Sequence, residues 1–179
     1  MDNILLLGDR RLRVVCDPVT DFNAPGFREE GGRLIAALER FRAEQGFGRA
    51  IAAPQIGIQR RIIAMNLGEG PFLIVNPVFK AVRDELFTLW DDCMSFPWLM
   101  VKVRRHAQLD VEFRDELGRL RQWERVGRAV SELLQHEVDH LDGILAVDRA
   151  LDRDSLVARE VYLEDKKAFD AQVDYAIGG

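Results

Sequence analysis

The chain has 179 residues, of which 47% are hydrophobic and 31% are charged, and its formal net charge is −5. This length and composition predict a single globular domain over residues 1–179, and the acidic balance without a basic stripe excludes a typical nucleic-acid-binding protein. Because no apolar run reaches transmembrane length, no signal peptide is apparent and the 2 cysteines are too few for a disulfide framework, we expect a cytoplasmic protein with no membrane partner.

The sequence predicts helices near both ends of the chain and strands between them. The first helix is expected over residues 31–45, because Leu34, Ala37, Leu38 and Phe41 recur at helical spacing on one side. The β-rich runs that follow lie at residues 60–66, 71–77 and 78–90.

Two further elements follow before the C-terminus. Residues 107–118 alternate apolar and polar side chains and end in a glycine-containing turn, which predicts a hairpin with residues 120–123. A last helix is expected from Asp154 or Ser155 to about Tyr175. The fold class is therefore α+β, with mixed or antiparallel sheets packed around a central helix and a further C-terminal helix.

The central helix carries the most informative motif of the chain, QHEVDHLDG at residues 135–143. Side chains four positions apart on a helix share a face, so His136 and His140 can point at one ion, and Glu137 completes the H-E-x-x-H pattern of zinc hydrolases. Charged helices also carry this short pattern by chance, with histidines that only meet solvent. The helix itself is supported by an apolar stripe of Val126, Ala129, Val130, Leu133, Leu134 and Leu141.

A catalytic metal normally takes three protein ligands and keeps one position open, so a third ligand is required. Glu160 and Glu164 lie downstream on a polar segment, and His106 lies in a basic stretch that resembles a solvated strand. Cys93 lies in the loop-like stretch WDDCMSFP, where a thiolate would complete a set suited to Zn²⁺ or Fe²⁺. The sequence ranks Cys93 first, and a plain buried thiol is the alternative.

Three segments together resemble the signatures of the peptide deformylase family. QHEVDHLDG, WDDCMS and GRAIAAPQIG are similar to the family's Q-H-E-x-D-H-L-x-G, E-G-C-L-S and G-x-G-x-A-A-P-Q, in the same order. The N-terminal ILLLGDRRLR, the strand FLIVNP and Arg105 also fit, and the resemblance covers Ile4 to about Leu151. It implies a hydrolase that removes the formyl group from the N-terminal formylmethionine of newly synthesised polypeptides and releases formate.

The resemblance also implies roles for individual residues. Cys93, His136 and His140 would hold one divalent metal ion, with Fe²⁺ native and Zn²⁺, Ni²⁺ or Co²⁺ found in purified protein. Glu137 would be the general base, and Gln55 would donate its side-chain N–H to the formyl oxygen, with the backbone N–H of Met94 as the second donor. Asp139 and Gln135 are candidates for supporting the ligand histidines. The expected partner is a nascent N-formylmethionyl peptide, with association with the ribosome as an option.

Three residues depart from the family signatures. Ala50 replaces a glycine, Asp91 replaces the usual glutamate, and Asp92 replaces the glycine beside the metal cysteine. We expect Asp92 to place a negative charge at the mouth of the site, where it would repel acidic peptides or attract a positive group. Two alternatives therefore stay open: a related enzyme acting on another N-formyl or small-acyl amine, and a non-catalytic metal protein that binds peptide N-termini.

Overall fold

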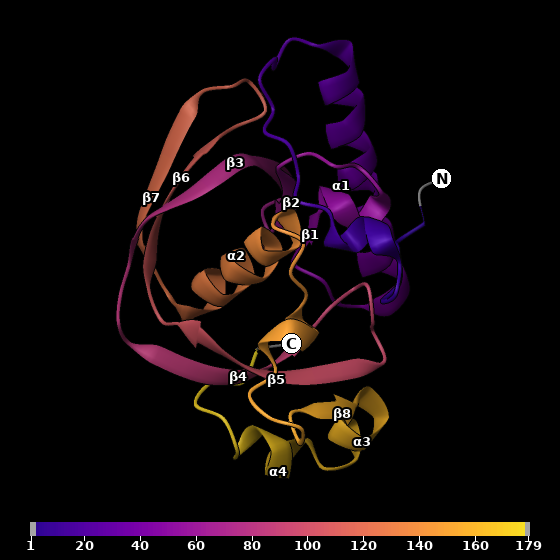
Figure 1. Ribbon diagram of the computed structural model, residues 1–179, viewed down its shortest axis with the longest axis vertical. Helices are drawn as coiled ribbons and strands as arrows, with labels where there is room; N and C mark the ends of the chain where they lie inside the picture. Colours follow the sequence, from indigo (N-terminus) through magenta and orange to yellow (C-terminus); the bar gives the residue numbers. More distant parts are fainter. Residues whose placement is uncertain (1–2, 178–179) are drawn as a thin grey trace.

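The computed structural model describes residues 3–177, which form two antiparallel sheets with a helix between them (Figure 1). The larger sheet has the strand order β1-β2-β3-β6-β7, and the smaller has the order β4-β5-β8. The strands of the larger sheet are β1 Ala50–Ala52, β2 Ile62–Asn66, β3 Pro71–Val82, β6 Leu109–Arg114 and β7 Leu120–Val126. Those of the smaller sheet are β4 Leu86–Asp92, β5 Leu99–His106 and β8 Leu156–Ala158.

The helices take three positions relative to these sheets. Helix α2, Arg128–Leu141, lies in the space enclosed by the two sheets, whereas α1, Pro25–Gln45, packs on the outer side of β1 and β2 (Figure 1). The short helices α3, Arg159–Glu164, and α4, Lys166–Asp170, lie beyond β4 and β5. Three 3₁₀ turns complete the fold: η1 Arg10–Arg13, η2 Ala53–Ile56 and η3 Ala146–Arg149.

Helix α2 is buried on two faces because it separates the sheets. Its apolar face, with Leu134 and Leu141 fully buried, packs in one cluster with Ile63, Ile74 and other side chains of the larger sheet. Its polar face meets the smaller sheet, where the Ser131 hydroxyl donates to the backbone oxygen of His106 at 2.7 Å. A helix between two sheets needs both faces satisfied, and α2 supplies apolar contacts on one side and hydrogen bonds on the other.

Helix α1 is longer than the sequence predicted. It begins at Pro25, a position where proline is well suited, and ends at Gln45. Gly46 follows with a φ of 75°, the left-handed conformation common after helices. Gly31, where the helix was predicted to start, lies inside it, and a Cβ at this position would lie 2.6 Å from Leu73 Cδ1. The glycine permits the close approach of α1 to β3.

The predicted hairpin of residues 107–123 is confirmed as β6 and β7, which pair in antiparallel register. The predicted continuous C-terminal helix is wrong in its extent. Leu156–Ala158 instead form strand β8 on the edge of β5, with Met100 opposite Val157. Asp165 then separates α3 from α4 with a non-helical φ of −139°, and its side chain accepts a hydrogen bond from the backbone N–H of Ala168.

The α+β class, the antiparallel sheets around a central helix and the presence of a C-terminal helix are confirmed. Within residues 3–177, no helix is both long and apolar enough to cross a membrane.

Candidate metal centre and active site

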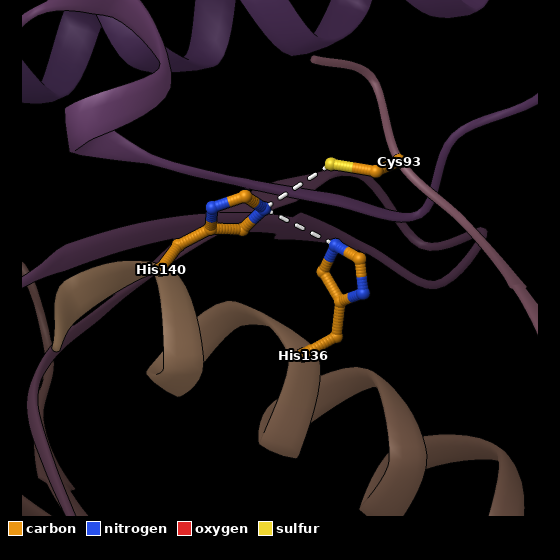
Figure 2. Close-up of side chains that lie close together, drawn as sticks. All are labelled: Cys93, His136 and His140. Atoms are coloured by element: carbon orange, nitrogen blue, oxygen red, sulfur yellow. Dashed lines mark hydrogen bonds between the residues drawn. The ribbon is translucent and has the colours of Figure 1, made fainter. Parts of the chain in front are cut away.

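Cys93, His136 and His140 converge in the interior of the protein (Figure 2). Cys93 follows the last residue of β4, and the two histidines stand one turn apart on α2. The Sγ atom of Cys93 lies 3.3 Å from Nε2 of His140, which lies 3.2 Å from Nε2 of His136. All three side chains are buried, and their candidate ligand atoms lie within 4.8 Å of one another.

This arrangement fits a tetrahedral metal ion. Bond lengths of about 2.1 Å to nitrogen and 2.3 Å to sulfur at tetrahedral angles separate the ligand atoms by roughly 3.4–3.6 Å. The observed separations of 3.2 and 3.3 Å are close to these values. The donor set of one thiol and two imidazoles suits Zn²⁺ or Fe²⁺. Burial and the neighbouring His136 lower the pKa of His140 well below its usual value, which favours the neutral ring that binds metals.

Asp91 orients His136, although the sequence favoured Asp139 for this task. Nδ1 of His136 lies 2.9 Å from Oδ2 of Asp91, which leaves Nε2 facing the other two ligands. Burial raises the pKa of Asp91, but His136 and Arg105 outweigh it and hold the pKa at about 2. A charged carboxylate on the far nitrogen of a ligand histidine is the usual support of a metal site.

Asp139 contacts Arg105, whereas the sequence predicted a contact with a ligand histidine. It accepts a hydrogen bond from Arg105 Nη1 at 2.5 Å, and Arg105 in turn donates to Asp91 at 3.2 Å. Gln135 bonds to neither histidine ligand in the structure, and its side chain donates to the backbone oxygen of His106 at 2.9 Å. Both residues therefore fix α2 against β5 rather than contact the ligand histidines.

Glu137 and Gln55 line the same cavity as Cys93 and His136, two of the three candidate ligands. Gln55 Nε2 lies 3.7 Å from Sγ of Cys93, and its Oε1 accepts from the backbone N–H of Ala52 at 2.9 Å. This second contact fixes which end of the amide points inward. Oε2 of Glu137 is buried and has no hydrogen-bond partner among residues 3–177. Burial raises the pKa of Glu137 to about 7, close to the value that suits a general base at neutral pH.

The cavity has a volume of about 390 Å³ and opens between α2, β4 and the C-terminal segment. Its mouth carries Asp92, but this carboxylate is not free to attract a substrate as the sequence suggested. Arg159 of α3 donates from Nη1 to Oδ2 of Asp92 at 3.3 Å and lies 4.2 Å over the Phe47 ring. The negative charge of Asp92 is therefore balanced by the C-terminal segment.

The other two departures from the family signatures are also accommodated. Ala50 is buried at the start of β1 and lines the cavity. Asp91 reaches both His136 and Arg105 despite its shorter side chain. Met94, buried beside Cys93, also lines the cavity, and the donor role of its backbone N–H stays a prediction.

The remaining ligand candidates do not reach the centre. Nδ1 of His106 lies 2.7 Å from the backbone oxygen of Arg83, at the far end of β5. Glu160 and Glu164 are exposed on α3. Among the described residues, the one group of side chains placed to hold a metal is Cys93, His136 and His140.

One feature of the cavity was not predicted from the sequence. Arg49 and Glu132 form an ion pair in the cavity wall, with Nη2 of Arg49 donating to Oε1 of Glu132 at 2.5 Å. Glu132 could have been recognised from the sequence as a candidate cavity residue, because it stands one turn before His136 on the same helix face and next to the apolar stripe. Its partner lies 83 residues away in the sequence, and only the fold brings it there.

The known proteins that resemble this chain in sequence and in structure carry the same description. The family model described as "Polypeptide deformylase" matches residues 1–155. A peptide deformylase of Thermotoga maritima is 31% identical over 164 residues, which is 92% of this chain and 96% of that protein. The crystal structure of a Thermotoga maritima peptide deformylase superposes with a TM-score of 0.77 at 30% identity, and covers 85% of this chain and 99% of that one. A peptide deformylase of Synechococcus elongatus gives a TM-score of 0.77 at 29% identity, over 96% and 88%.

Proposed function

The chain belongs to the polypeptide deformylase family, and on this premise we propose which residues hold its metal and which carry out the hydrolysis. The protein is a metal-dependent hydrolase that removes the formyl group from the N-terminus of newly synthesised polypeptides. The proposal rests on one observation above all: Cys93, His136 and His140 meet at one point beside Glu137 and Gln55.

Cys93, His136 and His140 hold the metal in this proposal. When bound, a divalent metal supplies a Lewis acid that lowers the pKa of water and polarises the formyl carbonyl. Asp91 keeps His136 oriented by its hydrogen bond to Nδ1. The thiol and two imidazoles support Fe²⁺ as the native ion, with Zn²⁺, Ni²⁺ or Co²⁺ as substitutes.

Glu137 moves the proton during the reaction. Its carboxylate takes a proton from the attacking water and returns it to the departing amine, so the products are formate and a free N-terminus. The raised pKa of Glu137 supports both transfers, because a base near neutrality gives the proton back as readily as it takes it. Its buried, unpartnered Oε2 is free to hold the water.

Gln55 stabilises the charge that develops on the formyl oxygen. Its Nε2 already points to the metal ligands, and the backbone N–H of Met94 is the proposed second donor. The loss of one such donor typically costs about 10²–10³ in rate. The peptide beyond the first residue leaves through the mouth between Asp92 and α3.

The family model ends at residue 155, and we extend the single domain to the end of the chain. Strand β8 pairs with β5, and Trp90 Nε1 of β4 donates to the backbone oxygen of Phe169 at 2.9 Å. The C-terminal segment also contributes Arg159 to the cavity. These contacts support one folding unit.

We place the protein in the cytoplasm, acting on nascent chains and near the ribosome. An iron site with a thiolate ligand is stable only where oxidation is limited, and both cysteines are free thiols. Elemental analysis of protein purified without oxygen tests the identity of the metal. Iron is the expected result, and stoichiometric zinc in its place would contradict this part of the proposal.

The test of the function is formate release from formyl-Met-Ala-Ser by protein loaded anaerobically with Fe²⁺ or Ni²⁺. We expect robust turnover, and a loss of about 10²–10⁴ in Glu137→Gln with metal content unchanged. Activity on other formamides alone would favour an enzyme for a different amine. No turnover by fully loaded protein would favour a non-catalytic binder of N-termini and overturn the proposal.

A further inference from the structure

The wall of the reaction cavity contains a buried ion pair that the proposed mechanism does not use. Nη2 of Arg49 donates to Oε1 of Glu132 at 2.5 Å, and Nη1 donates to the backbone oxygen of Ala129 at 2.8 Å. The side chain of Glu132 is 2% exposed and that of Arg49 is 28% exposed. A charged pair at this depth carries a desolvation cost that an apolar wall would avoid.

The pair lies in the wall of the cavity that the proposed catalytic residues also line. Glu132 stands one turn before His136 on the same face of α2, and Arg49 directly precedes β1. Both line the cavity that contains Cys93, His136 and Glu137. Burial is the largest influence on the raised pKa of Glu137. Arg49 lowers this pKa and Glu132 raises it, so both residues of the pair lie within electrostatic reach of the base.

The first side chain of the substrate has to meet this wall. The side chain is attached one carbon away from the nitrogen that loses its formyl group, so it stays inside the cavity during the reaction. The rest of the peptide needs an open path and leaves past Asp92 and Arg159, whose side chains are about a quarter exposed at 27% and 28%. The enclosed part of the cavity, where Glu132 and Leu133 are buried, is left for the first side chain.

The chemistry of the wall determines which side chain fits best. Above the raised pKa of Glu132, which is about 7, the pair has no net charge and favours neither a cationic nor an anionic side chain. It does offer donors on Arg49 and acceptors on Glu132. An apolar side chain that covers these atoms displaces the water bound to them and makes no hydrogen bonds in its place. A neutral side chain with a donor and an acceptor makes new hydrogen bonds to Arg49 and Glu132 instead.

We propose that Arg49 and Glu132 make this deformylase select N-formyl peptides with a neutral polar first side chain over apolar side chains of the same length. Glutamine is the model for this class, because its amide oxygen can accept from Arg49 while its amide N–H₂ donates to Glu132. Methionine, whose thioether is a weak acceptor, is accepted and ranks between glutamine and norleucine. The inference rests on the proposed function and adds a substrate class to it.

The test compares formate release from formyl-Gln-Ala-Ser and formyl-Nle-Ala-Ser by the metal-loaded protein at pH 8, where Glu132 is ionised. We expect kcat/KM for the glutamine peptide to exceed that for the norleucine peptide by about 10-fold or more, since the glutamine amide makes hydrogen bonds to charged groups that norleucine leaves unmade. In R49L/E132L, which replaces the pair with apolar side chains, the order should reverse. The matched control is K80L/E112L, which removes the ion pair of Lys80 and Glu112 outside the cavity and should keep the wild-type order.

Binding gives a second readout that does not depend on turnover. Calorimetry with Glu137→Gln, which is expected to hydrolyse substrate about 10²–10⁴-fold more slowly, should rank the two formyl peptides in the same order. A wild-type protein that prefers the norleucine peptide, or an order unchanged in R49L/E132L, overturns the inference. If R49L/E132L does not fold, the wild-type ratio decides alone. No formate from any formyl peptide, including formyl-Met-Ala-Ser, instead overturns the proposed function.

Discussion

Asp91 holds His136 with a side chain one methylene shorter than the glutamate of the family signature. The smaller reach is sufficient because Arg105 donates to the same Oδ2 atom that lies 2.9 Å from Nδ1 of His136. Asp91→Asn removes the charge and should lower metal affinity by about 10–100-fold. Competition with a chelator measures this loss. Asp92→Asn is the control, since Asp92 faces Arg159 instead of a ligand, and an equal loss there would contradict the assignment.

Glu132 makes stability depend on pH in a specific window. Burial raises its pKa from 4.5 to about 7, although Arg49 opposes this shift. Between these values the folded protein keeps a proton that the unfolded chain has lost, so stability falls as the pH rises from about 5 to 8. Glu132→Gln mimics the neutral acid and cannot lose that proton.

We therefore expect Glu132→Gln to match the wild type at pH 5 and to be more stable at pH 8. The difference at pH 8 should be on the order of 3 kcal/mol, as each pKa unit corresponds to about 1.4 kcal/mol. Urea denaturation of both proteins at the two pH values measures it. A difference that is the same at pH 5 and pH 8 would show that Glu132 does not titrate in this window.

At the scale of elements, Gly143 determines how the chain leaves α2. Its φ is 72°, and a Cβ there would lie 2.6 Å from the backbone oxygen of Arg13. Alanine at this position would have to adopt the left-handed conformation, and its methyl group would have to displace the backbone of Arg13. Gly143→Ala should destabilise the protein by more than about 1 kcal/mol, measured by urea denaturation.

The control for this substitution is at the other end of the same helix. Gly127 precedes α2 with an ordinary φ of −73°, and a Cβ there would meet nothing within 4 Å. Gly127→Ala should change stability much less than Gly143→Ala. An equal loss of stability in the two variants would contradict the explanation that Gly143 is required by its close approach to the backbone of Arg13.

Helix α3 balances the charge at the mouth of the cavity through Arg159. Arg159→Ala removes the partner of Asp92 and leaves a negative charge where the peptide exits. The wild type should hydrolyse formyl-Met-Ala-Lys and formyl-Met-Ala-Glu at similar kcat/KM. The variant should favour the lysine peptide by a few-fold at low salt, an effect that screening removes at about 1 M salt. A variant without charge preference would contradict this role.

At the scale of the whole molecule, the elements that the sequence predicted best are those with two independent signals. Helix α2 combines an apolar stripe with the H-E-x-x-H spacing, and the structure contains this helix over Arg128–Leu141. Val126, which was counted in the stripe, is instead the last residue of β7. Cys93 was ranked first among the third ligands because its surroundings differ from those of His106, and the structure places it 3.3 Å from His140.

The predictions that were wrong or missing depend on pairing across the chain. Residues 156–158 become a strand only because the edge of β5 is available to them, and local sequence does not contain that information. The pair of Arg49 and Glu132 is likewise created by the approach of β1 to α2. Asp139 was assigned to a histidine because it lies nearby in sequence, whereas the fold turns it toward Arg105.

The proposed hydrolysis requires one thiol and two imidazoles to bind the same ion. X-ray absorption spectroscopy of the Zn²⁺-loaded protein tests this directly, because sulfur and nitrogen ligands differ in distance. We predict one sulfur at about 2.3 Å and two imidazole nitrogens at about 2.0–2.1 Å, with the sulfur lost in Cys93→Ser and kept in Cys16→Ser. A metal shell without sulfur in the wild-type protein, or one that keeps its sulfur in Cys93→Ser, would contradict the account.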